Sequence, residues 1–157
     1  MISSHIGYYS LLLGFIISAS LLFYSIFYFK KNSQKINQNI FSLLFLQFFT
    51  VVISFISLVY SFIISDFSNA TVYNNSHSTK PIFYKITGTW GNHEGSLLLW
   101  LLVLTLFIFL FIVFSKKQPI KYRFLTIFFQ QLIITGFFFC EIFLIISIQV
   151  ISPEPIL

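Results

Sequence analysis

The chain has 157 residues, of which 57% are hydrophobic and only 8% are charged, and its mean hydropathy is +0.92. Soluble globular proteins carry about one quarter charged residues, so this composition excludes a soluble domain and predicts one membrane domain over residues 1–157. The net charge of +5 does not indicate a nucleic-acid partner, because most Lys and Arg residues fall in two short loops. Cys140 is the only cysteine, which excludes an internal disulfide or a thiolate metal cluster.

Four apolar runs predict four transmembrane helices and therefore an all-α polytopic fold. Each run reaches about the 20 residues that a helix needs to cross about 30 Å of hydrocarbon. Helices are favoured over strands because strand backbone in lipid would leave polar groups unsatisfied. The first run follows no basic residue and is too long for a signal peptide, so we expect it to stay in the mature protein. The predicted helices cover about residues 8–29, 40–65, 96–115 and 124–151.

The charges of the three connecting loops predict the orientation. The two short loops, residues 30–39 and 116–123, hold seven of the nine Lys and Arg residues. Positive charge is enriched on the cytoplasmic or matrix side of a membrane, so we expect both short loops there. The long loop, residues 66–95, and both chain termini are then expected on the external side, in the periplasm or intermembrane space.

Composition also indicates a location. The chain is rich in Phe, with 23 residues, and in Ile, Leu, Asn, Lys and Tyr. Such a bias is typical of AT-rich genomes and, among membrane proteins, of organelle-encoded chains. We therefore expect the mitochondrial inner membrane, with the bacterial inner membrane as the alternative.

The long loop ends in an unusual motif where the third helix is predicted to begin. Three glycines fall within eight residues there, which permits tight or left-handed backbone next to a ligand or another chain. Between the last two glycines stand an amide, an imidazole and a carboxylate. The residues concerned are Gly88, Trp90, Gly91, Asn92, His93, Glu94, Gly95 and Trp100.

Two interpretations of this motif are open. In the first, it is a helix N-terminus, where two tryptophans form an interfacial belt and Glu94 complements the helix dipole. In the second, it is a site on the outer membrane face for a flat, anionic or metal-bearing ligand. His93 has no second ligand at helical spacing, so no metal site is predicted. The spacing of His5 and His77 does not indicate a haem ligand pair either.

Three sequence features of the loop follow one another in a specific order. They are an N-N-S-H-S tract at residues 74–78, Tyr84-Lys85, and the run W-G-N-H-E-G-S-L-L-L-W at residues 90–100. This order and spacing closely resemble the CcmF/NrfE family, the haem lyase component of cytochrome c maturation. The resemblance extends over essentially the whole chain, but it covers only the beginning of a full-length family member. The chain therefore resembles the N-terminal fragment of a split haem lyase.

The resemblance implies a reaction and a set of candidate residues. Family members help to form thioether bonds between haem vinyl groups and the cysteines of an apocytochrome C-x-x-C-H site at the outer face of the membrane. The motif is then expected to lie near haem b. The candidate cofactor-binding residues are Trp90, Gly91, Asn92, His93, Glu94, Gly95 and Trp100.

The same resemblance implies that this chain does not work alone. The family's Trp-rich haem motif and its axial histidines have no counterpart here, so we assign no catalytic residue and no metal ligand. Haem b is expected to be held mainly by partner fragments that carry the Trp-rich motif. Further expected partners are a haem chaperone, apocytochrome c and the lipid bilayer.

Glu141 lies near the middle of the fourth predicted helix, where a charge costs about 3 kcal/mol on insertion scales. It lies eleven positions from Gln130, so both residues are expected on one helix face. This polar stripe is predicted to face protein and to dock the missing helices. A protonated, hydrogen-bonded Glu141 and a direct role in haem or proton handling both remain open. The adjacent Cys140 is expected to be a small buried hydrophobe.

Two classes of function compete. The first is a haem lyase subunit, which is not catalytic by itself. The second is a structural accessory subunit of a respiratory complex, derived from the same family. A small transporter is disfavoured because inverted repeats and discontinuous helices are not visible in the sequence.

Overall fold

The structure is a computed structural model that describes residues 2–31 and 38–151. Part of the first basic loop and the residues after 151 lie outside these ranges. Within them all regular structure is helical: α1 (Ile2–Lys31), α2 (Gln38–Ile63), α3 (Ala70–Asn75), α4 (Ile82–Gly88), α5 (His93–Phe114), the 3-10 turn η1 (Ser115–Lys117) and α6 (Ile120–Ile151). The four long helices are long and apolar enough to cross a membrane. The prediction of an all-α membrane protein with four transmembrane helices is therefore confirmed.

The helix bounds differ from those expected, for local reasons. α2 ends at Ile63 because Ser65 has a positive φ of 55°, and the amide of Asp66 then bonds back to Ser61 O at 3.0 Å. This left-handed residue with a backward hydrogen bond is a common helix terminator. α6 begins at Ile120, directly after Pro119, whose fixed φ suits the start of a helix.

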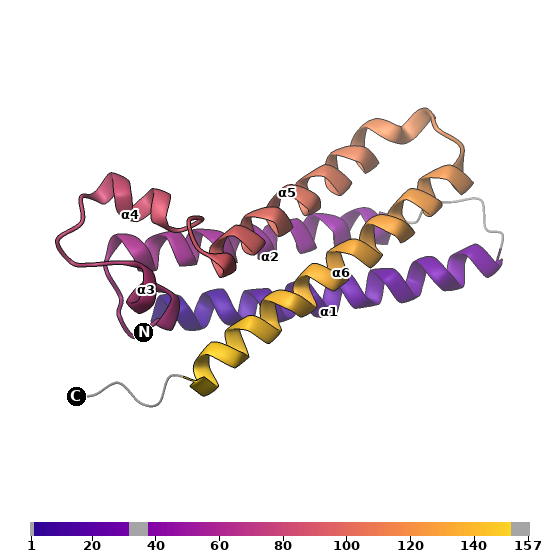
Figure 1. Ribbon diagram of the computed structural model, residues 1–157. Helices are drawn as coiled ribbons and strands as arrows, with labels where there is room; N and C mark the ends of the chain where they lie inside the picture. Colours follow the sequence, from indigo (N-terminus) through magenta and orange to yellow (C-terminus); the bar gives the residue numbers. More distant parts are fainter. Residues whose placement is uncertain (1, 32–37, 152–157) are drawn as a thin grey trace.

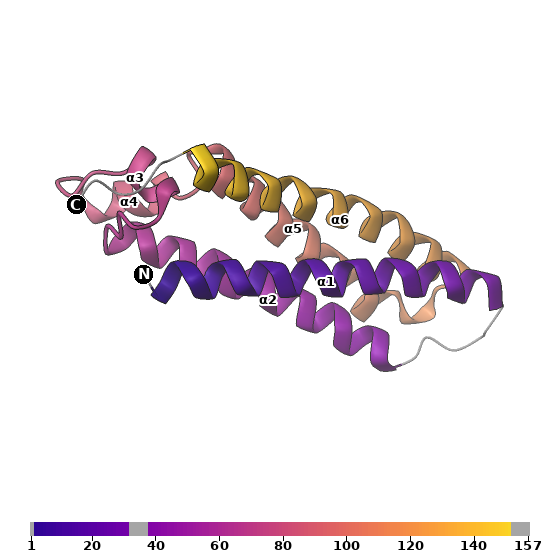
Figure 2. The same cartoon turned by 90° about the horizontal axis from the view of Figure 1, so that it is seen from below.

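The four long helices form a ring in which α1 packs on α2, α2 on α5, α5 on α6 and α6 on α1. α3 and α4 gather at one end of this bundle, where α1 begins and α6 ends (Figure 1). The view from below shows the same grouping, with α1 and α2 crossing along the near side (Figure 2). The segment between α2 and α5 thus lies at the same end of the bundle as the start of α1 and the end of α6. That this end faces the external side of the membrane stays a prediction.

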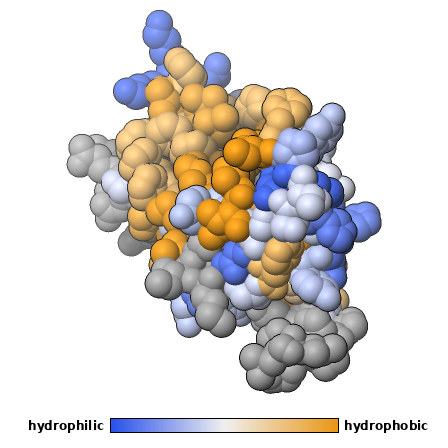
Figure 3. Space-filling model, turned by 90° about the vertical axis from the view of Figure 1, so that its left-hand side faces the viewer, coloured by the Kyte–Doolittle hydropathy of each residue, from blue (hydrophilic) through white to orange (hydrophobic). Residues whose placement is uncertain are grey.

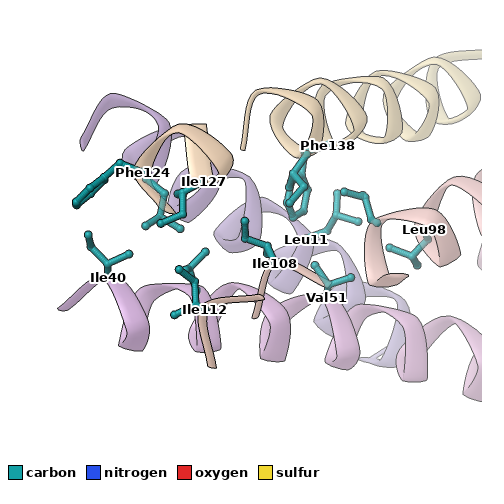
Figure 4. Packing of buried hydrophobic residues seen from close by; sticks show 13 residues of the cluster. Leu11, Ile40, Val51, Leu98, Ile108, Ile112, Phe124, Ile127 and Phe138 are labelled. Carbon is teal, nitrogen blue, oxygen red and sulfur yellow. The ribbon is translucent and has the colours of Figure 1, made fainter. Parts of the chain in front are cut away.

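Small residues let α1 approach its neighbours closely. Ser10, Gly14 and Ser18 recur every four residues and are buried, a spacing that brings membrane helices into close contact. A Cβ at Gly14 would lie 2.8 Å from Phe138 Cζ of α6, so a larger residue there would force the Phe138 ring to shift. Around these contacts a hydrophobic cluster fills the bundle along its length (Figure 4).

A reciprocal pair of amides crosses the centre of the bundle between α2 and α6. Gln131 Nε2 donates to Gln47 Oε1 at 2.9 Å, and Gln47 Nε2 donates to Gln131 Oε1 at 3.2 Å. Ser18 of α1 adds a third helix, because its hydroxyl donates to Gln131 Oε1 at 3.1 Å and lies 2.7 Å from Thr135 Oγ1. Both glutamines are fully buried. One network of side-chain hydrogen bonds therefore ties three helices together.

We expect that Gln131→Leu destabilises the chain by about 1–2 kcal/mol, because it leaves the Gln47 amide buried without a partner. Replacing both residues by Leu should recover most of this loss, since no orphaned amide remains. The unfolding of the purified chain in detergent, followed by tryptophan fluorescence as sodium dodecyl sulfate is added, measures both effects. Additive losses in the double variant would contradict a coupled pair.

Candidate functional site

Asn92 connects the two helices that frame the W-G-N-H-E-G motif. It is the N-cap of α5, where its Oδ1 accepts a hydrogen bond from Gly95 N at 2.7 Å. Its Nδ2 donates backwards to Gly88 O at 3.1 Å and to Thr89 O at 3.3 Å, at the end of α4. An N-cap of this type stabilises a helix by about 1 kcal/mol. The Asn92 side chain therefore shapes the turn and is occupied on both sides of its amide.

Gly95 is required by a close approach of the backbone. A Cβ at this position would lie 1.6 Å from Thr89 O, whereas the nearest atoms at Gly91 and Gly88 are 3.6 and 3.8 Å away. No described glycine has a positive φ, so of the tight or left-handed backbone that the glycines permit, the motif has the tight form. The turn is built by the Asn92 cap, and one glycine lets a carbonyl pack against the first turn of α5.

The side chains of His93 and Glu94 take no part in holding this turn together. Both belong to the first turn of α5, and His93 is exposed while Glu94 is half-buried. The described hydrogen bonds of the turn use the backbone, Asn92 and the Ser96 hydroxyl, but neither the imidazole nor the carboxylate. The motif thus divides into residues that hold the turn and residues that the turn displays.

The displayed residues line an open groove between α5 and α6, which we call the α5–α6 groove. It has a volume of about 670 Å³ and consists of His93, Glu94, Ser96, Leu97, Trp100, Phe137 and Leu144. Its floor is apolar, and an imidazole and a carboxylate stand at one end. Trp100 is 58% exposed on its wall. Such a surface suits a flat apolar ligand that approaches from outside the bundle.

The other histidines lie apart from this groove. His5 lines a different cavity, under α3, and His77 is exposed between α3 and α4. Within residues 2–31 and 38–151, three or more His, Cys, Asp or Glu side chains never cluster as metal ligands would. Trp90 is exposed but does not line the groove, so of the two tryptophans only Trp100 does.

The polar residues of α6 do not form one open stripe. Glu141 is 2% exposed and faces the interior of this chain's own bundle. Gln130 is half-buried and donates to Leu104 O of α5 at 3.4 Å. Docking of further helices on this pair stays a prediction. Cys140 is exposed, so its expected burial is wrong, because α6 turns that face away from the bundle.

The neighbouring Gln131 is the residue that sequence reasoning missed. A signal for it existed in α2, where buried polar residues alternate at spacings of three and four: Gln47, Thr50, Ser54, Ser57 and Ser61. This spacing marks a single polar face on α2. A buried amide on that face needs a partner of the same kind, and the first half of α6 offers two adjacent candidates, Gln130 and Gln131.

The short helix α4, at the same end of the bundle, buries a charged side chain and exposes large hydrophobic and aromatic ones. Lys85 is turned inwards and donates to Ser65 Oγ at 2.6 Å, while Ile82, Phe83 and Tyr84 are exposed. Hydrophobic residues accordingly lie beside hydrophilic ones when the molecule is viewed onto this end (Figure 3). The end that carries the motif is therefore not a uniformly polar loop surface.

Comparison with known proteins finds relatives of one kind. The chain is 57% identical over 61 residues to the cytochrome c-type biogenesis protein ccl1 of Rhodobacter capsulatus. The aligned residues make up 39% of this chain and 9% of that protein. It is 46% identical over 92 residues to CycK of Rhizobium meliloti, covering 59% and 14% of the two chains. It is 33% identical over 116 residues to CcmF of Haemophilus influenzae, covering 74% and 18%.

A solved structure extends the likeness to the fold. The structure of the cytochrome c haem lyase CcmF matches 99% of this chain with a TM-score of 0.69 at 22% identity. The match takes up 25% of that structure. No family model matches the chain. The chain thus has the fold of one part of a larger protein, and its aligned segments span less than a fifth of the three relatives above.

We expect Gly95→Ala to destabilise the chain by about 3 kcal/mol, because the added methyl group collides with the Thr89 carbonyl and forces the turn apart. Gly91→Ala is the matched control, since its Cβ would meet only ordinary contacts. Unfolding in detergent measures the stability, and limited proteolysis reports opening of the turn. Equal stability of the two variants would show that the close approach is not required.

Proposed function

Because the chain belongs to the CcmF/NrfE family of cytochrome c-type biogenesis proteins, we propose that it is one subunit of a haem lyase. In this role it supplies four transmembrane helices and an external loop to an assembly that attaches haem covalently to apocytochrome c. The observation that carries the proposal is the display of His93, Glu94 and Trp100 along the α5–α6 groove. A helix N-terminus that served only as an anchor would need neither the imidazole nor the groove.

The groove offers one face to a haem group and not a complete site. Its apolar floor and the Trp100 indole suit the face or edge of a porphyrin, and His93 is a residue type that ligates haem iron. Glu94 disfavours haem propionates at that end, because like charges repel at close range. The ligands of the iron and positive groups for the propionates would have to come from other chains. This chain therefore orients and shields haem in the proposed assembly, and partner fragments hold the iron.

The outer surfaces of α5 and α6 support an assembly larger than one chain. Large apolar side chains are exposed on both helices, among them Trp100, Phe107, Phe129, Phe139 and Phe143. Lipid alone could cover them, but the groove also exposes His93 and Glu94, which lipid would leave without partners. Further helices packed over the groove would satisfy these groups and close the site. We propose that those helices belong to a fragment with the family's Trp-rich motif, and that a haem chaperone and apocytochrome c approach from the external side of the mitochondrial or bacterial inner membrane.

We expect His93→Ala and Glu94→Ala each to lower the yield of covalent cytochrome c by about tenfold, as for residues that support a metal cofactor. Haem staining of c-type cytochromes, in cells that express each variant in place of the natural chain, measures this yield. His77→Ala is the control, because it removes an exposed imidazole of the same loop outside the groove. Normal yields for both groove variants would reduce the motif to an anchor.

Purification of the chain in mild detergent tests the assembly directly. We expect a second membrane polypeptide with a Trp-rich motif to purify with it, together with haem that has a b-type pyridine haemochrome spectrum. The competing function, a structural subunit of a respiratory complex, predicts recovery only within an oxidase or dehydrogenase. Recovery of that kind, without a haem-lyase partner, would overturn the proposed function.

A further inference from the structure

A second cavity lies inside the bundle at the end that carries α3. It has a volume of about 490 Å³, and residues of α1, α2, α3, α5 and α6 line it. Its apolar part includes Leu11 and Leu98, which lie at the end of the hydrophobic cluster away from Ile40 and Phe124 (Figure 4). Its polar part includes Glu94 and Glu141, and we therefore call it the carboxylate cavity. Its size is that of a site for a small organic ligand.

Glu141 is the unusual member of this cavity. It is 2% exposed, and its Oε2 has no hydrogen-bond partner in the described part of the chain. An unpaired buried carboxylate is costly, and it is rarer still within a membrane-spanning helix. Glu141 is one of the residues that line the cavity, so its carboxyl group borders the space that a ligand would occupy. The described part of the chain therefore supplies no hydrogen-bond partner for this carboxylate oxygen.

The walls offer several hydrogen-bond acceptors, and the protons of two of their hydroxyl groups are already engaged. Ser54 Oγ donates to Gly7 O at 3.1 Å and Ser61 Oγ donates to Ser57 O at 3.0 Å, so these hydroxyl protons are engaged by the backbone. Their oxygens, like those of the two carboxylates, remain acceptors. Among the residues that line the cavity, His5 is the one basic side chain, and Lys and Arg do not contribute. The cavity thus calls for a ligand with a positive charge and several N–H donors.

This chemistry separates the possible ligands. An anion such as a phosphate or a propionate is disfavoured, because Glu94 and Glu141 repel it. A divalent metal ion would need more ligating side chains than the described residues bring together. A primary ammonium fits, since it carries three N–H donors and one positive charge. An attached alkyl chain would lie against the leucines of the apolar wall.

We propose that the carboxylate cavity binds a primary alkylammonium group, with Glu141 and Glu94 accepting its N–H donors. The ammonium can belong to a small free amine or to a lysine side chain of another polypeptide. Its binding gives the buried Glu141 carboxylate the partner that it lacks within the chain. Glu141 does not line the α5–α6 groove, so this site and the proposed haem-facing groove can be tested separately.

The test measures binding of n-butylammonium to the full chain in lipid nanodiscs at constant ionic strength. Saturation-transfer difference NMR of the butyl protons detects the bound ligand, and n-butanol serves as an uncharged ligand of the same shape. We expect saturable binding of n-butylammonium and none of n-butanol. Glu141→Gln and Glu94→Gln should each weaken binding by about tenfold or more, because each removes a charged hydrogen bond.

Asp66→Asn is the matched control, since it removes a carboxylate at the same end of the bundle that does not line the cavity. It should leave binding unchanged. Unfolding in detergent checks that each variant is folded, and Glu94→Gln, near the rim, tests the site even if Glu141→Gln does not fold. Absent or non-saturable binding to the natural chain would overturn the proposal, and so would folded Glu94→Gln and Glu141→Gln variants that bind n-butylammonium as tightly as the natural chain.

A competition experiment then identifies the source of the ammonium group. A short capped peptide with one lysine is added to the complex with n-butylammonium. Displacement by this peptide, and not by the same peptide with acetylated lysine, assigns the site to a lysine of a partner polypeptide. Retention of n-butylammonium assigns it to a small free amine.

Discussion

The paired amides of Gln47 and Gln131 set the arrangement of the helices on which every other feature depends. In lipid, apolar side chains do not drive helices together, so association relies on close packing and on hydrogen bonds between helices. The two glutamines bond to each other twice, and Ser18 joins them to α1. A rotation of α2 or α6 would strand a buried amide, so the pair fixes which faces of these helices meet. That choice in turn decides where Glu141 and the walls of the groove lie.

The turn between α4 and α5 positions the side chains of His93 and Glu94 at one end of this bundle. Asn92 and Gly95 both have structural roles. Asn92 caps α5 and uses its amide as donor and acceptor, and Gly95 allows the close approach of the Thr89 carbonyl. His93 and Glu94 stand between them in the sequence and are held out by the same turn. In the W-G-N-H-E-G motif, Asn92 and Gly95 therefore hold the turn, and His93 and Glu94 between them have side chains that the turn does not use.

Glu94 lies at the boundary between two hollows with different chemistry. On one side is the apolar α5–α6 groove, open to the surroundings of the bundle, and on the other the acceptor-rich carboxylate cavity under α3. In the described part of the chain the groove is open on one side, and Glu141 Oε2 at the cavity has no hydrogen-bond partner. In the proposed assembly, other chains would border both hollows, since this chain aligns with only a small part of its relatives.

The sequence by itself determined the membrane class, the number of transmembrane helices and the position of the motif, because each depends on the length of an apolar run or on local order. Only the tertiary structure decided which face of each helix points inwards. Helices such as α5 and α6 are apolar all round, so hydrophobic periodicity cannot separate Gln130 from Gln131 or place Cys140. The same limit hid the shared cavity of Glu94 and Glu141, which are far apart in sequence and line one cavity only because of how α5 and α6 are rotated against each other.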